Sequence, residues 1–130
     1  MTLLDAASYM RKAERALGEA RLLLRERATE GACSRAYYAM HDVAHAALIS
    51  AGHETPDALI KTHHALIAAF GKHLVQGGQI DAALGRAFNK VQDTRQLADY
   101  SAEPPALPDA AWAVEQAELF VAALSARFGL

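Results

Sequence analysis

Arg95 interrupts the apolar face of a predicted helix, where a permanently charged side chain is costly to bury. The helix spans about residues 81–102, and its apolar positions recur at helical spacing. They are Leu84, Phe88, Val91, Ala98 and Ala102. A guanidinium keeps its proton, so the face must either neutralise it or line a polar cleft. Asp99 lies one turn on and Tyr100 follows, so we select Arg95, Asp99 and Tyr100 as candidate catalytic residues.

A second group of reactive side chains projects from one side of the preceding predicted helix, about residues 29–52. Arg35, Tyr38, His41, Asp42 and His45 fall on that side at 100° per residue, opposite an apolar face. These residue types bind anions, stack on bases or transfer protons. Two interpretations stay open, an ordinary solvent-exposed face and a cleft shared with Arg95.

Other catalytic patterns have weaker support. His41 and His45 have the spacing of two metal ligands on a helix, but no third ligand is evident. Cys33, the only cysteine, lacks the partners of a thiol nucleophile. Gly77-Gly78 is not followed by the Lys-Ser or Lys-Thr of a phosphate loop. The inward Glu-x-x-His pairs of a bundle-type metal hydrolase are absent from the sequence. We therefore predict no metal site and no cofactor.

Length and composition indicate one domain over residues 1–130, with no membrane segment. Apolar residues make up 52% of the 130, and the net charge of −2 argues against a generally basic nucleic-acid coat. A local basic cleft remains compatible with that charge. No apolar run approaches the ~20 residues needed to cross a bilayer. With one cysteine and no signal peptide, the expected compartment is the cytoplasm.

The elements that must position these residues are five helices without strands. We expect them at about 5–27, 29–52, 56–76, 81–102 and 109–128. Thr29, Thr55 and Asp109 are the predicted N-caps of the second, third and fifth, and residues 103–108 read as a proline-rich connector. Short links between long helices predict an all-α, up-and-down bundle of four to five antiparallel helices.

The last helix carries a second apolar line in addition to its core face. It consists of Trp112, Leu119 and Ala123. Either the core face is wide or the line is a partner interface, where tryptophan is favoured.

Three segments in order resemble a bacterial branch of the HEPN superfamily, named for higher eukaryotes and prokaryotes nucleotide-binding. Residues 34–40 (SRAYYAM) are similar to the opening of that branch's second helix. Residues 61–63 (KTH) are similar to the start of its third helix, and residues 95–101 (RQLADYS) to its R-x-x-A-D-Y signature. The resemblance is carried by about residues 32–102.

This resemblance implies a four- or five-helix bundle that forms a homodimer. Many HEPN domains are metal-independent RNases whose site forms at the dimer interface. Their motif is an arginine, four to six residues and a histidine, in which the arginine binds the scissile phosphate. The histidine assists attack by the ribose 2′-hydroxyl. Bacterial relatives are often paired, as toxin and antitoxin, with a minimal nucleotidyltransferase, which in some pairs adenylylates a tyrosine beside the motif.

The chain departs from this motif at its histidine. Arg95 takes the arginine position, but Tyr100 follows the next four residues, and no histidine occurs after His73. Tyrosine is a poor base at neutral pH. Arg35 and His41 satisfy the spacing on another helix, which we interpret as coincidental. His41, His45 or His63 can take the role from a neighbouring helix or a second subunit.

Two functions follow from the resemblance. One is a toxin-like RNase, and the alternative is a non-catalytic binding or regulatory module that partners a nucleotidyltransferase. In both, Arg95 binds phosphate with Asp99 orienting it, and Tyr100 is a cleft wall or a modification site. The candidate RNA- or nucleotide-binding residues are Arg35, Tyr38, His41 and His63. A wholly structural role for Arg95 and Asp99, as a buried pair, also stays open.

Overall fold

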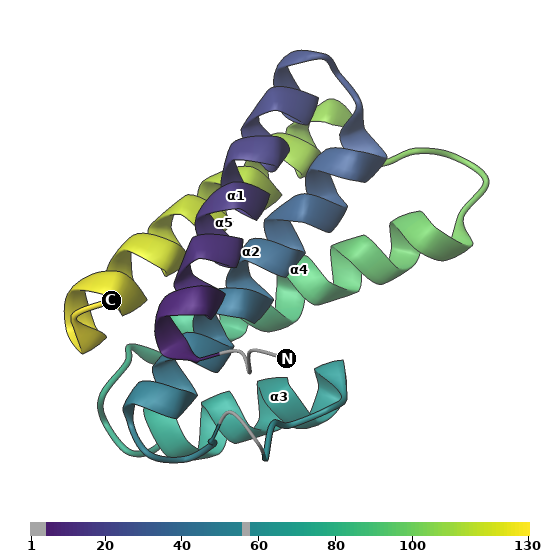
Figure 1. The fold of residues 1–130 in the computed structure, drawn as a ribbon. Helices are drawn as coiled ribbons and strands as arrows, with labels where there is room; N and C mark the ends of the chain where they lie inside the picture. The colour runs from purple at the N-terminus through teal and green to yellow at the C-terminus, as the bar shows by residue number, and fades with distance from the viewer. Residues whose placement is uncertain (1–4, 56–57) are drawn as a thin grey trace.

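Four long helices and one short helix form the fold in the computed structural model, which describes residues 5–55 and 58–130 (Figure 1). They are α1 (Ala6–Arg25), α2 (Thr29–Ser50), α3 (His63–Phe70), α4 (Ala82–Tyr100) and α5 (Leu107–Phe128), with a π-helical turn η1 (Gly71–Val75) after α3. These ranges contain no strand, only an isolated bridge between Thr55 and Ala58. The predicted all-α bundle is confirmed.

Helix α2 is the central element of the bundle and packs against α1, α4 and α5. Its many alanines allow this, because small side chains let neighbouring helices approach closely. Figure 1 shows α1 and α4 on either side of α2, with α3 lying across one end of the long helices. Asp42 and His45 are only 6% and 3% exposed. The interpretation of an ordinary exposed face is therefore wrong for these two residues.

Aromatic side chains from four helices form the centre of the core. The ring centroids of Phe70, Phe88 and Phe120 lie 5.0 to 5.6 Å from one another. Tyr37 of α2 stacks on Phe88 at 6.0 Å, and all four side chains are almost fully buried. The ring of Tyr37 is therefore part of the core, and its position fixes the position of its hydroxyl group.

Helix α3 begins later than local sequence reasoning predicts. The side chain of Thr62, not Thr55, caps it by accepting a hydrogen bond from the backbone N–H of Ala65 at 3.0 Å. Pro56, the predicted first helical residue, lies outside the described residues. The start expected from the KTH segment is correct, and it makes His63 the first residue of the helix.

Two other predicted caps are also wrong. Thr29 is already helical, because Arg27 closes the α1–α2 turn with a φ of 59° and Ala28 is the N-cap. Helix α5 begins at Leu107, so Asp109 lies in its first turn instead of capping it. Pro108 is compatible with that start, since the first turn of a helix needs no backbone donor there. The connector before α5 is correspondingly shorter than predicted.

The second apolar line on α5 is divided between core and surface. Trp112 and Ala123 pack against the core, whereas Leu119 is 54% exposed. A wide core face thus explains two of the three side chains. Across the described ranges, no helix is both long and apolar enough for a bilayer span.

Candidate functional site

Arg95 lies at the edge of the core with its charge paired and its side chain 13% exposed. Its Nη1 donates to Asp99 Oδ2 at 2.9 Å, and its Nε donates to Gln92 Oε1 at 3.0 Å. The guanidinium carbon lies 4.9 Å from the centroid of the Tyr37 ring and 5.8 Å from that of Tyr38. The two predicted ways of accommodating the Arg95 charge therefore occur together. Asp99 neutralises it, and the arginine also lines a polar groove.

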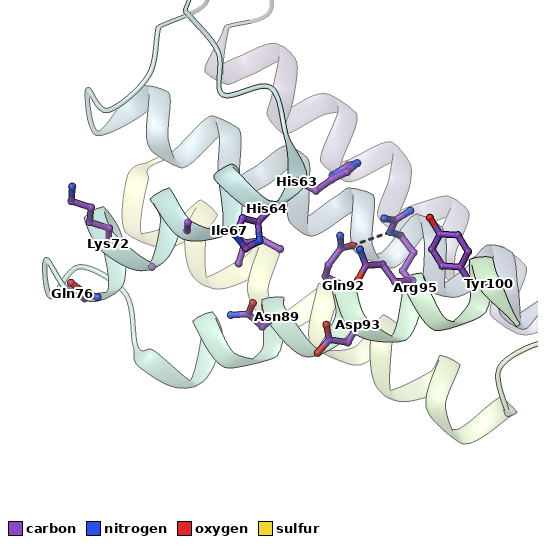
Figure 2. Close-up of a pocket in the computed structure, with 13 residues that line it drawn as sticks. His63, His64, Ile67, Lys72, Gln76, Asn89, Gln92, Asp93, Arg95 and Tyr100 are labelled. Atoms are coloured by element: carbon purple, nitrogen blue, oxygen red, sulfur yellow. Dashed lines mark hydrogen bonds between the residues drawn. The ribbon is translucent and has the colours of Figure 1, made fainter.

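That groove runs between α3–η1 and α4 and has a volume of about 640 Å³. Arg95, Tyr100 and His63 contribute to its lining at one end (Figure 2). Lys72 lies at the other end. The protein as a whole is slightly acidic, yet this groove has two permanent cations, Lys72 and Arg95, in its lining beside the carboxylate of Asp93, and Asp99 already pairs with Arg95. An anion can bind there where it displaces Asp99 from Arg95 or reaches Lys72.

His63 is held in place by a buried phenol. The Tyr37 hydroxyl oxygen lies 2.8 Å from His63 Nδ1. Burial raises the pKa of Tyr37 well above its usual range, so this hydroxyl stays protonated. Burial also lowers the pKa of His63, and the neighbouring His41 and Arg95 lower it further. The imidazole is thus largely neutral at pH 7, the form that can accept a proton.

Two further imidazoles continue from His63 into the bundle. The ring centroids of His63 and His41 lie 5.0 Å apart, and those of His41 and His45 lie 4.7 Å apart. His41 Nδ1 lies 3.2 Å from Asp42 Oδ1. His45 Nδ1 lies 2.8 Å from Glu54 Oε1. Each of the three rings thus has a partner at Nδ1, which fixes its orientation.

Glu54 anchors the segment that leads to His63, and sequence reasoning missed it. Its side chain is fully buried, accepts a hydrogen bond from the Ile60 backbone N–H at 2.9 Å and faces His45. Tyr9 of α1 stacks on that imidazole, with the ring centroids 4.7 Å apart. Burial lowers the pKa of His45 against the opposing attraction of the Glu54 carboxylate. A glutamate in a loop gives no periodic signal, which is why the pattern did not reveal it.

Tyr38 and Arg35 extend the cluster along α2. The guanidinium of Arg35 lies 5.0 Å from the Tyr38 ring centroid, so Tyr38 contacts both Arg35 and Arg95. Arg35 also lies 3.7 Å from Glu19 of α1. The structure therefore places Arg95, Tyr38, His41 and His63 together, with Arg35 at the margin through Tyr38. Tyr38 and His41 thus contact residues of the groove, but no residue of α2 lines the groove itself, so a cleft shared between α2 and Arg95 stays a prediction.

Tyr100 stands apart from this cluster. Its side chain is 89% exposed, and Leu97, one turn earlier, is 72% exposed. Tyr100 lines the groove beside Arg95, but it is not part of the cluster that the three imidazoles form. Cys33 is fully buried, and burial raises the pKa of its thiol to about 11. Residues 5–55 and 58–130 contain no group of three side chains arranged to hold a metal ion.

The fold and the site together define an all-helical protein with an arginine- and histidine-containing groove between α3–η1 and α4. The family model described as the HEPN domain matches residues 6–127. The chain belongs to the HEPN family. It is 33% identical over 109 residues to a protein of Methanocaldococcus jannaschii named "Putative toxin MJ0605", covering 84% of this chain and 78% of that one.

Two bacterial proteins are also similar. A UPF0332 protein of Thermotoga maritima is 29% identical over 92 residues, or 71% of this chain and 66% of the relative. A UPF0332 protein of Gloeobacter violaceus, glr0978, is 31% identical over 96 residues, or 74% and 72%.

Proposed function

We propose that this HEPN protein is a toxin-like, metal-independent endoribonuclease in which His63 replaces the histidine that α4 lacks. The observation that carries the proposal is that Arg95 and His63 line one groove and contact the same buried side chain, Tyr37. Arg95 lies on α4 and His63 is the first residue of α3, so the two are far apart in the sequence. Both side chains nevertheless line the same groove.

Cleavage of RNA by its own 2′-hydroxyl requires one group that binds the phosphate and another that transfers a proton. Arg95 offers its guanidinium to the scissile phosphate, a charge-assisted interaction. In the tautomer whose Nδ1–H donates a hydrogen bond to the Tyr37 oxygen, His63 Nε2 is free to accept the proton of the ribose 2′-hydroxyl. The 2′-oxygen then bonds to phosphorus while the bond to the 5′-oxygen breaks. The leaving oxygen takes the proton from the imidazolium, giving a 2′,3′-cyclic phosphate and a 5′-hydroxyl end.

The test is cleavage of a mixed tRNA and mRNA pool in EDTA, with the product ends analysed. Wild type is expected to cut. His63→Gln is expected to lose at least ~100-fold in rate, the usual effect of losing an acid–base group, and Arg95→Ala, which removes the phosphate contact, is expected to lose a comparable factor. Arg21→Ala is the matched control, since Arg21 pairs with Glu118 at 3.0 Å on another face. Equal rates in Arg95→Ala and wild type would overturn the proposal.

A non-catalytic binding module is the second candidate. Two observations favour it, namely that Tyr100 stands where the motif has histidine and that Asp99 and Gln92 already engage Arg95. This function predicts that wild type binds RNA or a nucleotide without cutting, and that Arg95→Ala weakens binding. If neither protein binds, Arg95 and Asp99 form only a structural pair.

We further propose that the protein acts in the cytoplasm as a homodimer and pairs with a minimal nucleotidyltransferase. The exposed side chains of Leu97 and Tyr100 support an interaction surface at the end of α4. Light scattering of wild type and Leu97→Glu tests the dimer, which the variant should dissociate. Mass spectrometry after incubation with ATP and such a transferase tests modification of Tyr100, with Tyr100→Phe as the control.

A further inference from the structure

We propose that the groove between α3–η1 and α4 binds unpaired RNA bases and discriminates among them through a row of amide side chains. The strand would extend from the phosphate held by Arg95 toward Lys72. This inference rests on the proposed function, because Arg95 supplies its phosphate anchor. It adds the residues that select among the bases of the strand.

Three amide side chains line the groove on the α4 side. Asn89, Gln92 and Gln96 follow one another at intervals of three and four residues, which places them on one helical face. Gln76, just after η1, adds a fourth amide. A primary amide offers two donors and an acceptor, the combination that pairs with the edge of a base.

Two of these amides are oriented by bonds they already make. The Gln92 oxygen accepts from Arg95 Nε at 3.0 Å, which leaves its NH₂ group as the donor. The Asn89 NH₂ group donates to the Gly85 carbonyl at 3.3 Å, which leaves its oxygen as an acceptor. The groove thus presents a donor near Arg95 and an acceptor further along. A fixed order of donor and acceptor can distinguish one base from another.

The opposite wall leaves space for a base. Ala68 and Gly71 line it, and a Cβ atom added at Gly71 would meet nothing within 4 Å. Gly71 opens the π-helical turn η1, and such turns occur often at functional sites. A volume of about 640 Å³ is in the range of small-molecule sites.

The charges at the two ends fit a nucleic-acid strand. Figure 2 shows Arg95 at one end of the groove and Lys72 at the other, with Asn89 and Gln92 between them. This alternation of cation, amides and cation suits successive phosphates with exposed bases between them. A duplex would not fit, because its base edges are paired and its major groove is too narrow for side chains to read.

The experiment measures binding of 5′-labelled 2′-O-methyl oligonucleotides by fluorescence anisotropy, using homopolymers of each base and a blunt duplex. The 2′-O-methyl group removes the nucleophile, so binding is separated from cleavage. Wild type is expected to prefer one single strand over the weakest by about tenfold, in line with a single base contact, and to bind the duplex poorly. Asn89→Ala and Gln96→Ala should reduce that preference, and Lys72→Ala should weaken all binding and lower its salt dependence.

Ala68→Phe tests the groove by filling it. Residue 68 is exposed, so the bundle should fold normally and lose at least ~10-fold in affinity for every single strand. Ala126→Phe, at an exposed position of α5, is the matched control and should bind like wild type.

Three results would overturn the inference. If Arg95→Ala loses binding while Ala68→Phe and the amide variants do not, the proposed function survives and the groove is not the base site. If wild type cleaves the RNA pool but shows no base preference, the inference alone fails. If wild type neither binds nor cleaves, both fail.

Discussion

The Tyr37 hydroxyl oxygen and the Nδ1 atom of His63 lie 2.8 Å apart, so a core residue of α2 orients the first imidazole of α3. The same tyrosine ring lies under the Arg95 guanidinium. One buried side chain therefore positions both groups to which we assign the chemistry.

Tyr37→Phe keeps the ring and removes the hydroxyl. We expect the free energy of unfolding to fall by about 1 kcal/mol, because His63 Nδ1 loses its buried partner. Urea unfolding measures this change. Tyr38→Phe is the control, since Tyr38 is only partly buried, and should stay within about 0.5 kcal/mol of wild type. Equal losses in both variants would show that the hydroxyl of Tyr37 has no special role.

The pKa of His63 should lie below its ordinary value of 6.5, chiefly because of burial and then because of His41 and Arg95. Between the lowered pKa and 6.5 the unfolded chain binds more protons than the folded one. Stability should therefore fall as the pH drops through this window and be constant with respect to His63 above it. His41→Gln should raise the pKa of His63, as followed by NMR titration of its C2 proton. An unchanged midpoint would contradict the expected coupling between the two imidazoles.

Glu54→Ala should be strongly destabilising. The variant removes the acceptor of the Ile60 N–H and the partner of His45, both at a buried position. We expect a loss of about 3 kcal/mol in unfolding free energy, with faster amide exchange in the segment before His63. Glu118→Ala removes an exposed ion pair and should change stability by less than about 0.5 kcal/mol. If both variants lose the same amount, the buried carboxylate is not an anchor.

Asp99→Asn should separate stability from binding. The pair with Arg95 spans one helical turn and Asp99 is 42% exposed, so its loss should change stability by less than about 0.5 kcal/mol. Because Gln92 still holds Arg95 Nε, the freed Nη1 can face a phosphate, and we expect RNA to bind a few-fold more tightly. Anisotropy with the oligonucleotides described above measures this effect. Weaker binding would instead show that the Asp99 charge is needed to orient Arg95.

Helical periodicity predicted the bundle well because most of the helices have one face in the core and the opposite face in solvent. The stripe of α5, for example, is buried at Ala113, Ala117, Phe120 and Leu124. Periodicity failed at helix ends, where one cap or one turn residue decides the boundary. Thr55 and Thr62 are both plausible caps by type, and only the folded chain selects Thr62.

The site was only partly predictable for a related reason. Arg95 is visible as a charge on an apolar face, and its contact with Asp99 follows from helical spacing. The approach of His63 to Tyr37 depends on how α3 crosses the bundle, which no local pattern encodes. Glu54 and Gln92 could not be selected from the sequence, because what distinguishes them is their burial in the folded chain.

The position of Tyr37 also bears on how such a protein can change over generations. A side chain that both fills the core and orients two polar groups answers to two selective pressures at once. Substitutions there that spare folding would still disturb the groove, whereas Asn89 and Gln96, the two exposed amides of α4, can vary without cost to the core. Neutral substitutions should therefore change which RNA strands the groove prefers before they change Tyr37, His63 and Arg95.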